Sequence, residues 1–165
     1  MNTKILILII VLLTVSATIA SARAENGIGL GVIIGEPTGI SIKKWIGPDR
    51  AIDAAAAWSF SENDSFQFHA DYLFHKFDIL KIEPATGRLP VYFGIGGRVK
   101  LRNQDNHGGR NNNDTLLGVR APIGISYLFP KAPVDFFAEI VPILDLTPDT
   151  DFDINGAIGA RFYFR

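Results

Sequence analysis

The stretch SFQFHADYLFH, from Ser65 to His75, decides the fold because apolar residues occupy every second position in it. This period of two is typical of a β-strand whose two faces meet different surroundings. Which face points inward determines the architecture of the whole chain. The apolar face holds Phe66, Phe68, Ala70, Tyr72 and Phe74, and the opposite face carries Gln67, His69, Asp71 and His75.

The N-terminus has the pattern of a secretory signal peptide. A short polar region ending in Lys4 precedes the apolar run ILILIIVLL, and Ala22 and Ala24 form an A-x-A cleavage signal. A retained membrane helix would need about 20 apolar residues, and threonine and serine interrupt the run too early. We therefore expect residues 1–24 to be cleaved on export and residues 25–165 to form a single domain.

The composition excludes several classes of protein. The chain of 165 residues has no cysteine, so the exported product has neither disulfides nor a thiolate metal site. The formal net charge of -1 gives no electrostatic reason to expect binding to nucleic acid. The three histidines lack the spacing of metal ligands. We expect no metal and no cofactor.

The alternation of the opening stretch recurs along the mature chain, in segments separated by turn residues. Short connections between consecutive strands predict an antiparallel meander, and closure of the meander removes its exposed edges. The asparagine- and glycine-rich stretch 102–114 is predicted to be a solvated loop. The predicted strands are 27–35, 38–45, 50–60, 65–75, 90–101, 115–129, 133–146 and 151–164.

The side chains on the two faces of these strands differ in size as well as in polarity. A soluble calyx would expose the glycine- and alanine-rich face, and these residues suit a solvated strand surface poorly. An eight-stranded membrane barrel has a narrow interior that small side chains fit. Aromatic residues, Phe60 among them, fall near both strand ends, as in the girdles of membrane barrels. We expect the apolar face to touch lipid and an ion network to line the lumen, formed by Asp53, His69, Asp71, Arg98, Arg120, Glu139 and Arg161.

The mature sequence resembles the small outer-membrane β-barrels of the OmpA transmembrane domain and OmpX class. The resemblance is carried by the signal peptide ending in ARA, the alternating segments and the final strand NGAIGARFYF. It implies an all-β, eight-stranded antiparallel up-and-down transmembrane β-barrel in the bacterial outer membrane. Ile158, Phe162 and Phe164 match the terminal signal that the outer-membrane assembly machinery reads, although Arg165 follows the last aromatic residue. The expected partners are this machinery, outer-membrane lipids and lipopolysaccharide, and the barrel is expected to be a monomer.

Barrels of this class serve as anchors, adhesins, small pores and lipid enzymes, so the resemblance leaves the function open. Charges of both signs on the inner face predict a structural ion network that seals the lumen. Glu139 and Arg161 are expected about diagonal to each other across the last hairpin, within reach of their long side chains. A small pore is the alternative. His69 and Ser126 lie at different depths, so we expect no enzyme, with a lipid A-modifying acyltransferase or deacylase as the alternative.

Two prolines, Pro122 and Pro142, interrupt predicted neighbouring strands at about the same height. Proline removes a hydrogen bond from the ladder of a central strand. One interpretation is a pair of β-bulges that adjust the twist. The other is a lateral opening between the sixth and seventh predicted strands that admits a lipid or a hydrophobic ligand, similar to the proline-flanked gap of the lipid A palmitoyltransferase barrel.

Overall fold

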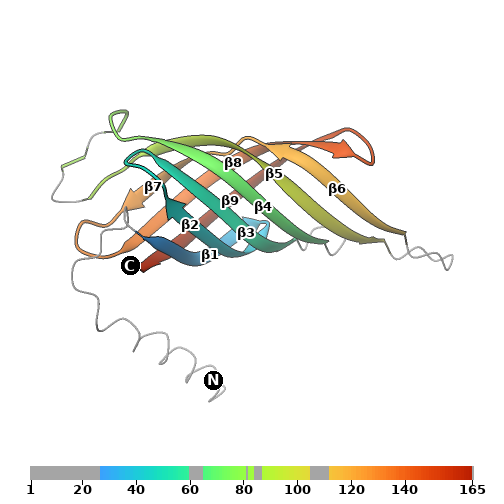
Figure 1. Ribbon diagram of the computed structural model, residues 1–165, viewed down its shortest axis with the longest axis horizontal. Coiled ribbons are helices and arrows are strands. Elements are labelled where there is room, and N and C mark those ends of the chain that lie inside the picture. The colour runs from blue at the N-terminus through green and yellow to red at the C-terminus, as the bar shows by residue number, and fades with distance from the viewer. Residues whose placement is uncertain (1–26, 60–64, 81, 84–86, 105–111, 165) are drawn as a thin grey trace, which may run out of the picture.

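The computed structural model describes residues 27–59, 65–80, 82–83, 87–104 and 112–164, and these form one antiparallel sheet of nine strands (Figure 1). Within them no helix has the length and apolar character needed to cross a membrane. The strands are β1 (Ile28–Glu36), β2 (Thr38–Trp45), β3 (Arg50–Ser59), β4 (Ser65–Lys76), β5 (Val91–Gln104), β6 (Asn112–Arg120), β7 (Ile123–Leu128), β8 (Val134–Thr147) and β9 (Asp151–Phe164).

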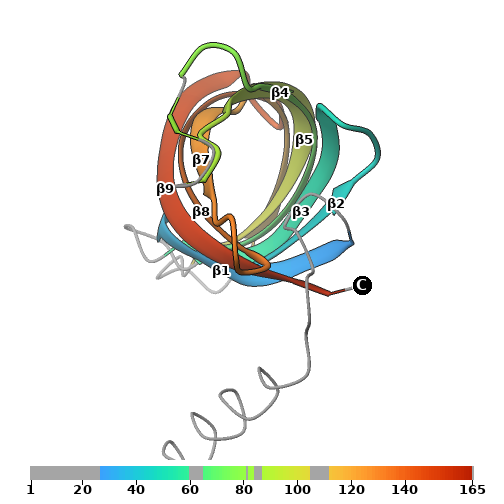
Figure 2. The same ribbon diagram turned by 90° about the vertical axis from the view of Figure 1, so that its left-hand side faces the viewer.

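The sheet closes on itself because the first strand pairs with the last. β1 and β9 run antiparallel in register from Ile28 opposite Phe164 to Glu36 opposite Gly156. β6 and β7 follow one another in a single position between β5 and β8, so the ring has eight positions. A view along the axis shows the closed ring (Figure 2). The predicted eight-stranded antiparallel barrel is confirmed.

Most of the large apolar side chains lie on the outside of the ring, and most of the charged side chains of the strands lie inside it. Ile95 and Ile158 are each 60% exposed, whereas Arg98 is 3% and Arg120 is 2% exposed. In β4 the burial alternates along the whole strand. The polar face of the opening stretch, Gln67, His69, Asp71 and His75, is therefore the inner face.

The hairpin of β5 and β6 is longer than the sequence predicts. Backbone pairing continues from Arg102 opposite Asp114 to Gln104 opposite Asn112, so both ends of the predicted loop 102–114 are strand. Ladder hydrogen bonds join backbone groups and therefore propagate along a hairpin without apolar side chains. The middle of that loop, the end of the predicted strand at Phe60, residues 1–24 and Arg165 lie outside the described residues.

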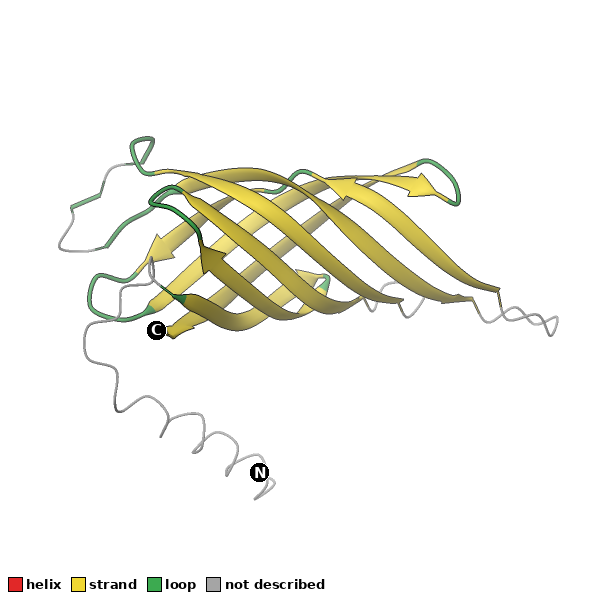
Figure 3. Cartoon of the chain, viewed as in Figure 1, coloured by secondary structure: helices red, strands yellow, loops and turns green. Residues whose placement is uncertain are grey.

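The segment between β4 and β5, which begins at Phe77, lies at the end of the barrel where β9 terminates (Figure 3). Arg88 forms a β-bridge with Leu128, and its guanidinium lies 3.7 Å from the centre of the Phe77 ring. At the opposite end, Pro37 alone separates β1 from β2. Outer-membrane barrels usually have short turns at the end that holds the termini, so this long connection is a distinctive feature of the chain.

The two prolines leave the strand register unchanged. Arg120 pairs with Ile143 before Pro122 and Ile123 pairs with Ile140 after it. The amide of Ala121 donates to the carbonyl of Pro142 at 3.0 Å. The register irregularity between these strands lies at Leu117 and Gly118, away from the prolines. The strands thus remain joined beside Pro122 and Pro142, and a lateral opening there stays a prediction.

Candidate functional site in the barrel lumen

Arg98 on β5 binds two carboxylates near the end of the barrel that lies opposite the termini. Its guanidinium lies 2.5 Å from Asp145 on β8 and 3.2 Å from Asp153 on β9. Asp145 is almost completely buried, whereas the Asp153 side chain is 39% exposed. This arginine therefore joins one side of the ring to the other at the mouth of the lumen.

Arg120 on β6 joins two carboxylates in the middle of the lumen. Its Nε atom lies 3.0 Å from Asp71 on β4, and its Nη2 atom lies 3.7 Å from Glu139 on β8. The hydroxyl of Tyr92 donates a hydrogen bond of 2.8 Å to the other oxygen of Glu139. Four strand positions are linked through these side chains.

Arg161 on β9 binds two carboxylates nearer the termini. It forms an ion pair with Asp53 on β3 and lies 3.6 Å from Asp135 on β8. Its Nε atom donates a hydrogen bond of 2.8 Å to Ser41 Oγ. The guanidinium carbon lies 3.8 Å from the centre of the Phe137 ring, a cation–π contact. This buried cation therefore has carboxylate, hydroxyl and aromatic partners.

Glycines on intervening strands allow the charged side chains to reach one another. Gly96 on β5 pairs with Asp71 on one side and with Arg120 on the other. A Cβ atom at Gly96 would collide with Asp71 Oδ1, so the ion pair between Asp71 and Arg120 passes over the glycine. The same arrangement recurs at Gly118 between Arg98 and Asp145, and at Gly31 between Arg161 and Ser41.

Lys43 forms a further polar cluster toward the termini. Its Nζ atom lies 2.8 Å from His75 Nε2 and 4.0 Å from Asp135. The hydroxyl of Tyr163 donates a hydrogen bond of 2.8 Å to the same oxygen of Asp135. Trp45 packs against His75 with ring centroids 4.4 Å apart. This cluster lies between the layer of Arg161 and the end of the barrel that holds the termini.

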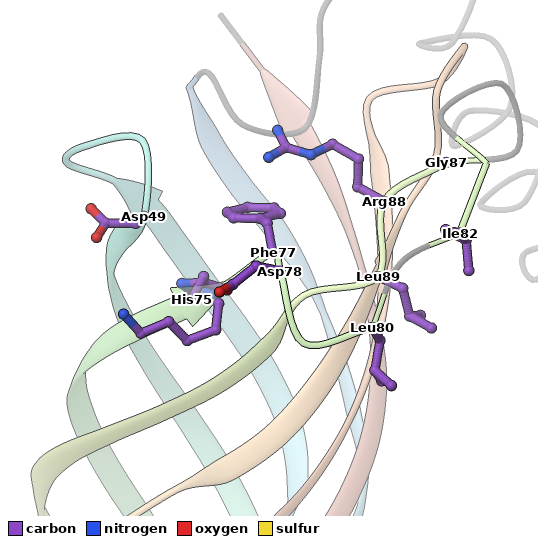
Figure 4. Close-up of a pocket in the computed structure, with 10 residues that line it drawn as sticks. Asp49, His75, Phe77, Asp78, Leu80, Ile82, Gly87, Arg88 and Leu89 are labelled. Carbon is purple, nitrogen blue, oxygen red and sulfur yellow. The ribbon is translucent and has the colours of Figure 1, made fainter.

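A pocket of about 750 Å³ lies at this end, between the segment that follows β4 and the turn before β3 (Figure 4). Phe77 and His75 lie at its centre in the figure, with Asp49 on one side and Arg88 on the other. Phe77 stacks on Trp45 at 6.3 Å between ring centroids. Two of the residues that line this pocket, His75 and Phe77, are thus in ring contact with Trp45.

The structure places all seven predicted lumen residues on the inner face and brings most of them into the ion network. His69 is an exception, since its Nδ1 atom lies 3.3 Å from Gln67 Nε2. The predicted pairing of Glu139 with Arg161 is wrong. The ladder of β8 and β9 places Glu139 opposite Ala157 and Arg161 opposite Asp135, so Arg161 lies four residues along β9 from the position opposite Glu139 and not at a diagonal position two residues away.

Sequence reasoning missed four lumen residues of the network, Lys43, Asp135, Asp145 and Asp153. The signal for them was present in the alternation, because Lys43 is in phase with Asp53 across a ladder. Asp135 and Asp145 are likewise in phase with Glu139 on β8. Within the described residues, no group of three or more histidines or carboxylates is arranged to hold a metal ion. These lumen residues are joined by ion pairs and hydrogen bonds.

This chain matches no protein-family model and no curated protein. Two of the solved structures that are similar to it are outer-membrane barrels. The first is the N-terminal β-barrel domain of Pseudomonas aeruginosa OprF, with a TM-score of 0.65, 15% sequence identity, and coverage of 83% of this chain and 95% of that chain. The fold of the small outer-membrane barrels is confirmed. The second is Neisserial surface protein A (NspA), with a TM-score of 0.51, 16% identity, and coverage of 83% and 93%. At these identities the likeness concerns the fold alone.

Replacing Gly118 by alanine tests whether the ion pair between Arg98 and Asp145 needs a glycine on the strand between them. The new Cβ would collide with Asp145 Oδ1 and contact Arg98 at 3.4 Å, so we expect a loss of about 1–3 kcal/mol in the free energy of unfolding. Denaturant titration of the barrel in lipid vesicles measures it. Gly156→Ala is the matched control, because the nearest atom to its new Cβ is 4.0 Å away. Equal stability of the two variants would contradict the steric account.

Replacing Arg120 by methionine tests the buried ion network. Asp71 and Glu139 would lose their shared cation, and breaking a buried pair in this way costs about 3–5 kcal/mol. The free energy of unfolding in lipid vesicles is again the measurement. Arg50→Met is the control, because the pair of Arg50 with Asp49 is exposed and is expected to contribute little. If both variants were as stable as the original chain, the lumen charges would not be coupled.

Proposed function

We propose that residues 25–165 form an outer-membrane β-barrel whose polar, ion-paired lumen is sealed, and whose role at the bacterial cell envelope is structural or interactive. The observation that carries the proposal is the sidedness of the wall. Ile95 and Ile158 face outward on a closed ladder, whereas Arg120 and Arg161 are buried inside it. Closed barrels satisfy all backbone groups within hydrocarbon, and an apolar exterior suits lipid rather than water.

Sealing of the lumen is supported by the side chains that cross it at successive heights. Eight strands leave an interior only wide enough for side chains. Arg98, Arg120 and Arg161 each link different strands, and Tyr92 and Phe137 belong to a buried apolar cluster beside them. A small pore, the alternative, would need these side chains to move apart together.

A non-enzymatic role is supported by how the lumen side chains are used. Ser41 accepts a hydrogen bond from Arg161, and His69 lies beside Gln67. A nucleophile needs a free base within hydrogen-bond reach. Ser41 also donates to Asp53 at 3.4 Å, but that carboxylate is paired with Arg161. The chain is proposed to reach the outer membrane after removal of its signal peptide, to insert as a monomer, and to meet outer-membrane lipids and lipopolysaccharide there.

The terminal strand supports a role for the assembly machinery as a partner. Ile158 and Phe164 face outward on β9, at 60% and 37% exposure, and Phe162 lies on the same face between them. In the closed barrel this strand is paired on both sides, with β1 and β8. We propose that the machinery reads these three side chains before β9 closes the ring.

Electrophoresis and planar-bilayer recording together test the proposed function. The refolded mature chain should migrate differently before and after boiling in detergent, and it should give no steady single-channel currents. Tyr92→Ala/Phe137→Ala, which removes two buried rings from the lumen, is the matched control and should raise the ion leak. Migration unaffected by boiling would contradict the membrane barrel. Steady currents from the original chain would contradict the sealed lumen and favour the small pore.

A further inference from the structure

An apolar groove of about 680 Å³ crosses the outer wall of the barrel over β1, β9, β8 and β7. Gly156 and Ala138 are the small outward residues that line it, and isoleucines stand beside them. Ile158 is 60% and Ile140 is 62% exposed, among the largest exposed fractions of apolar side chains on the described wall. The groove exists because small residues interrupt an otherwise bulky surface.

The groove follows one row of paired residues and therefore slants across the wall. Ile34 pairs with Ile158, and the row continues through Ala138 and Ile125 to Val91. From β1 to β4 this row would span about 24 Å, at about 4.8 Å between strands. With strands tilted by about 35–45°, it climbs about 14–17 Å, roughly half of the ~30 Å hydrocarbon core. The row, extended from Ile34 in the groove to Lys76, which pairs with Val91 on β4, thus spans about the depth of one leaflet.

Charges of opposite sign lie near the two ends of this row, with Lys76 on the row at one end and Glu36 two residues beyond Ile34 at the other. Lys76 on β4 pairs with Val91 and is exposed at the end of the barrel that holds the termini. Glu36 pairs with Gly156 at the other end. Between them Glu139 is turned toward the lumen, where Tyr92 and Arg120 hold its carboxylate. A phosphate would therefore be attracted to the Lys76 end and repelled from the other.

We propose that this groove binds one glycerophospholipid from the leaflet at the terminal end, with an acyl chain in the groove and the phosphate at Lys76. The proposal rests on the proposed location of the barrel in a membrane. The groove is continuous with the apolar wall and has a cation where a headgroup would lie, a combination that fits a phospholipid. The groove also lies beside Pro122 and Pro142. Because the strands remain joined there, the lipid is proposed to lie on the wall and not to pass through it.

Native mass spectrometry of the refolded barrel, titrated with phosphatidylglycerol in detergent, tests the site. The original chain should retain one lipid. Ala138→Leu/Gly156→Leu fills the groove and should lower the bound fraction at least fivefold. Space is open around Gly156, so the fold should tolerate the change. Ala70→Leu, at an outward alanine of β4 away from the groove, is the matched control and should bind as the original does.

The headgroup contact has its own pair of variants. Lys76→Gln should weaken binding about fivefold, the effect expected for one lysine beside a phosphate. Lys44→Gln, at an exposed outward lysine on β2, should leave it unchanged. Equal binding by the filled-groove variant and the original, or by Lys76→Gln and the original, would overturn the proposal. The proposal would also be overturned if the original chain formed a dimer and the filled-groove variant did not, because the groove would then be an interface between copies.

Migration of every variant before and after boiling separates this proposal from the proposed function. If all the proteins migrate as folded barrels and the groove variants still bind lipid normally, the lipid site is wrong and the membrane barrel stands. If the original chain itself lacks this heat-dependent migration, the proposed function fails, and the lipid site fails with it.

Discussion

The width of a closed ring of eight strand positions constrains everything else in this structure. Such a ring has no free edges, and its interior holds side chains and little more. Each large inward side chain therefore needs a small neighbour on the next strand. Tyr163 lies over Gly29, Phe137 over Gly159 and Tyr92 over Gly124. The glycines and alanines of the inner face leave the space that the large inward side chains fill.

The same constraint explains why arginine carries the charges in the middle of the lumen. A guanidinium on a long stem reaches past a glycine on the next strand and binds carboxylates with several donors. Arg98, Arg120 and Arg161 each meet two carboxylates, so each arginine crosses the ring at its own height. These ion pairs hold the fold together because separating them is costly. Either partner left alone would be a buried charge with no opposite charge beside it.

The strands and their faces could be predicted from the sequence because each depends on a local period of two. The alternation in Ser65–His75 assigns Gln67, His69 and Asp71 to the inside. Ion-pair partners could not be predicted in the same way, because they depend on the register between strands. From the sequence, Glu139 and Arg161 are expected at diagonal positions two residues apart on the ladder, and they lie four residues apart on it. The length of the β5–β6 hairpin also escaped prediction, since its pairing is a property of the backbone.

The central claim is that bulky apolar residues of the wall face hydrocarbon. Because the chain has no cysteine, spin labels can be attached at single cysteines introduced at Val91, Ile95 and Leu101, outward positions along β5. In lipid vesicles, collision with dissolved oxygen should exceed collision with a water-soluble nickel complex most strongly at Ile95, and less at the two ends. A label at Ile95 that met the nickel complex freely, or that neither reagent reached, would contradict the account.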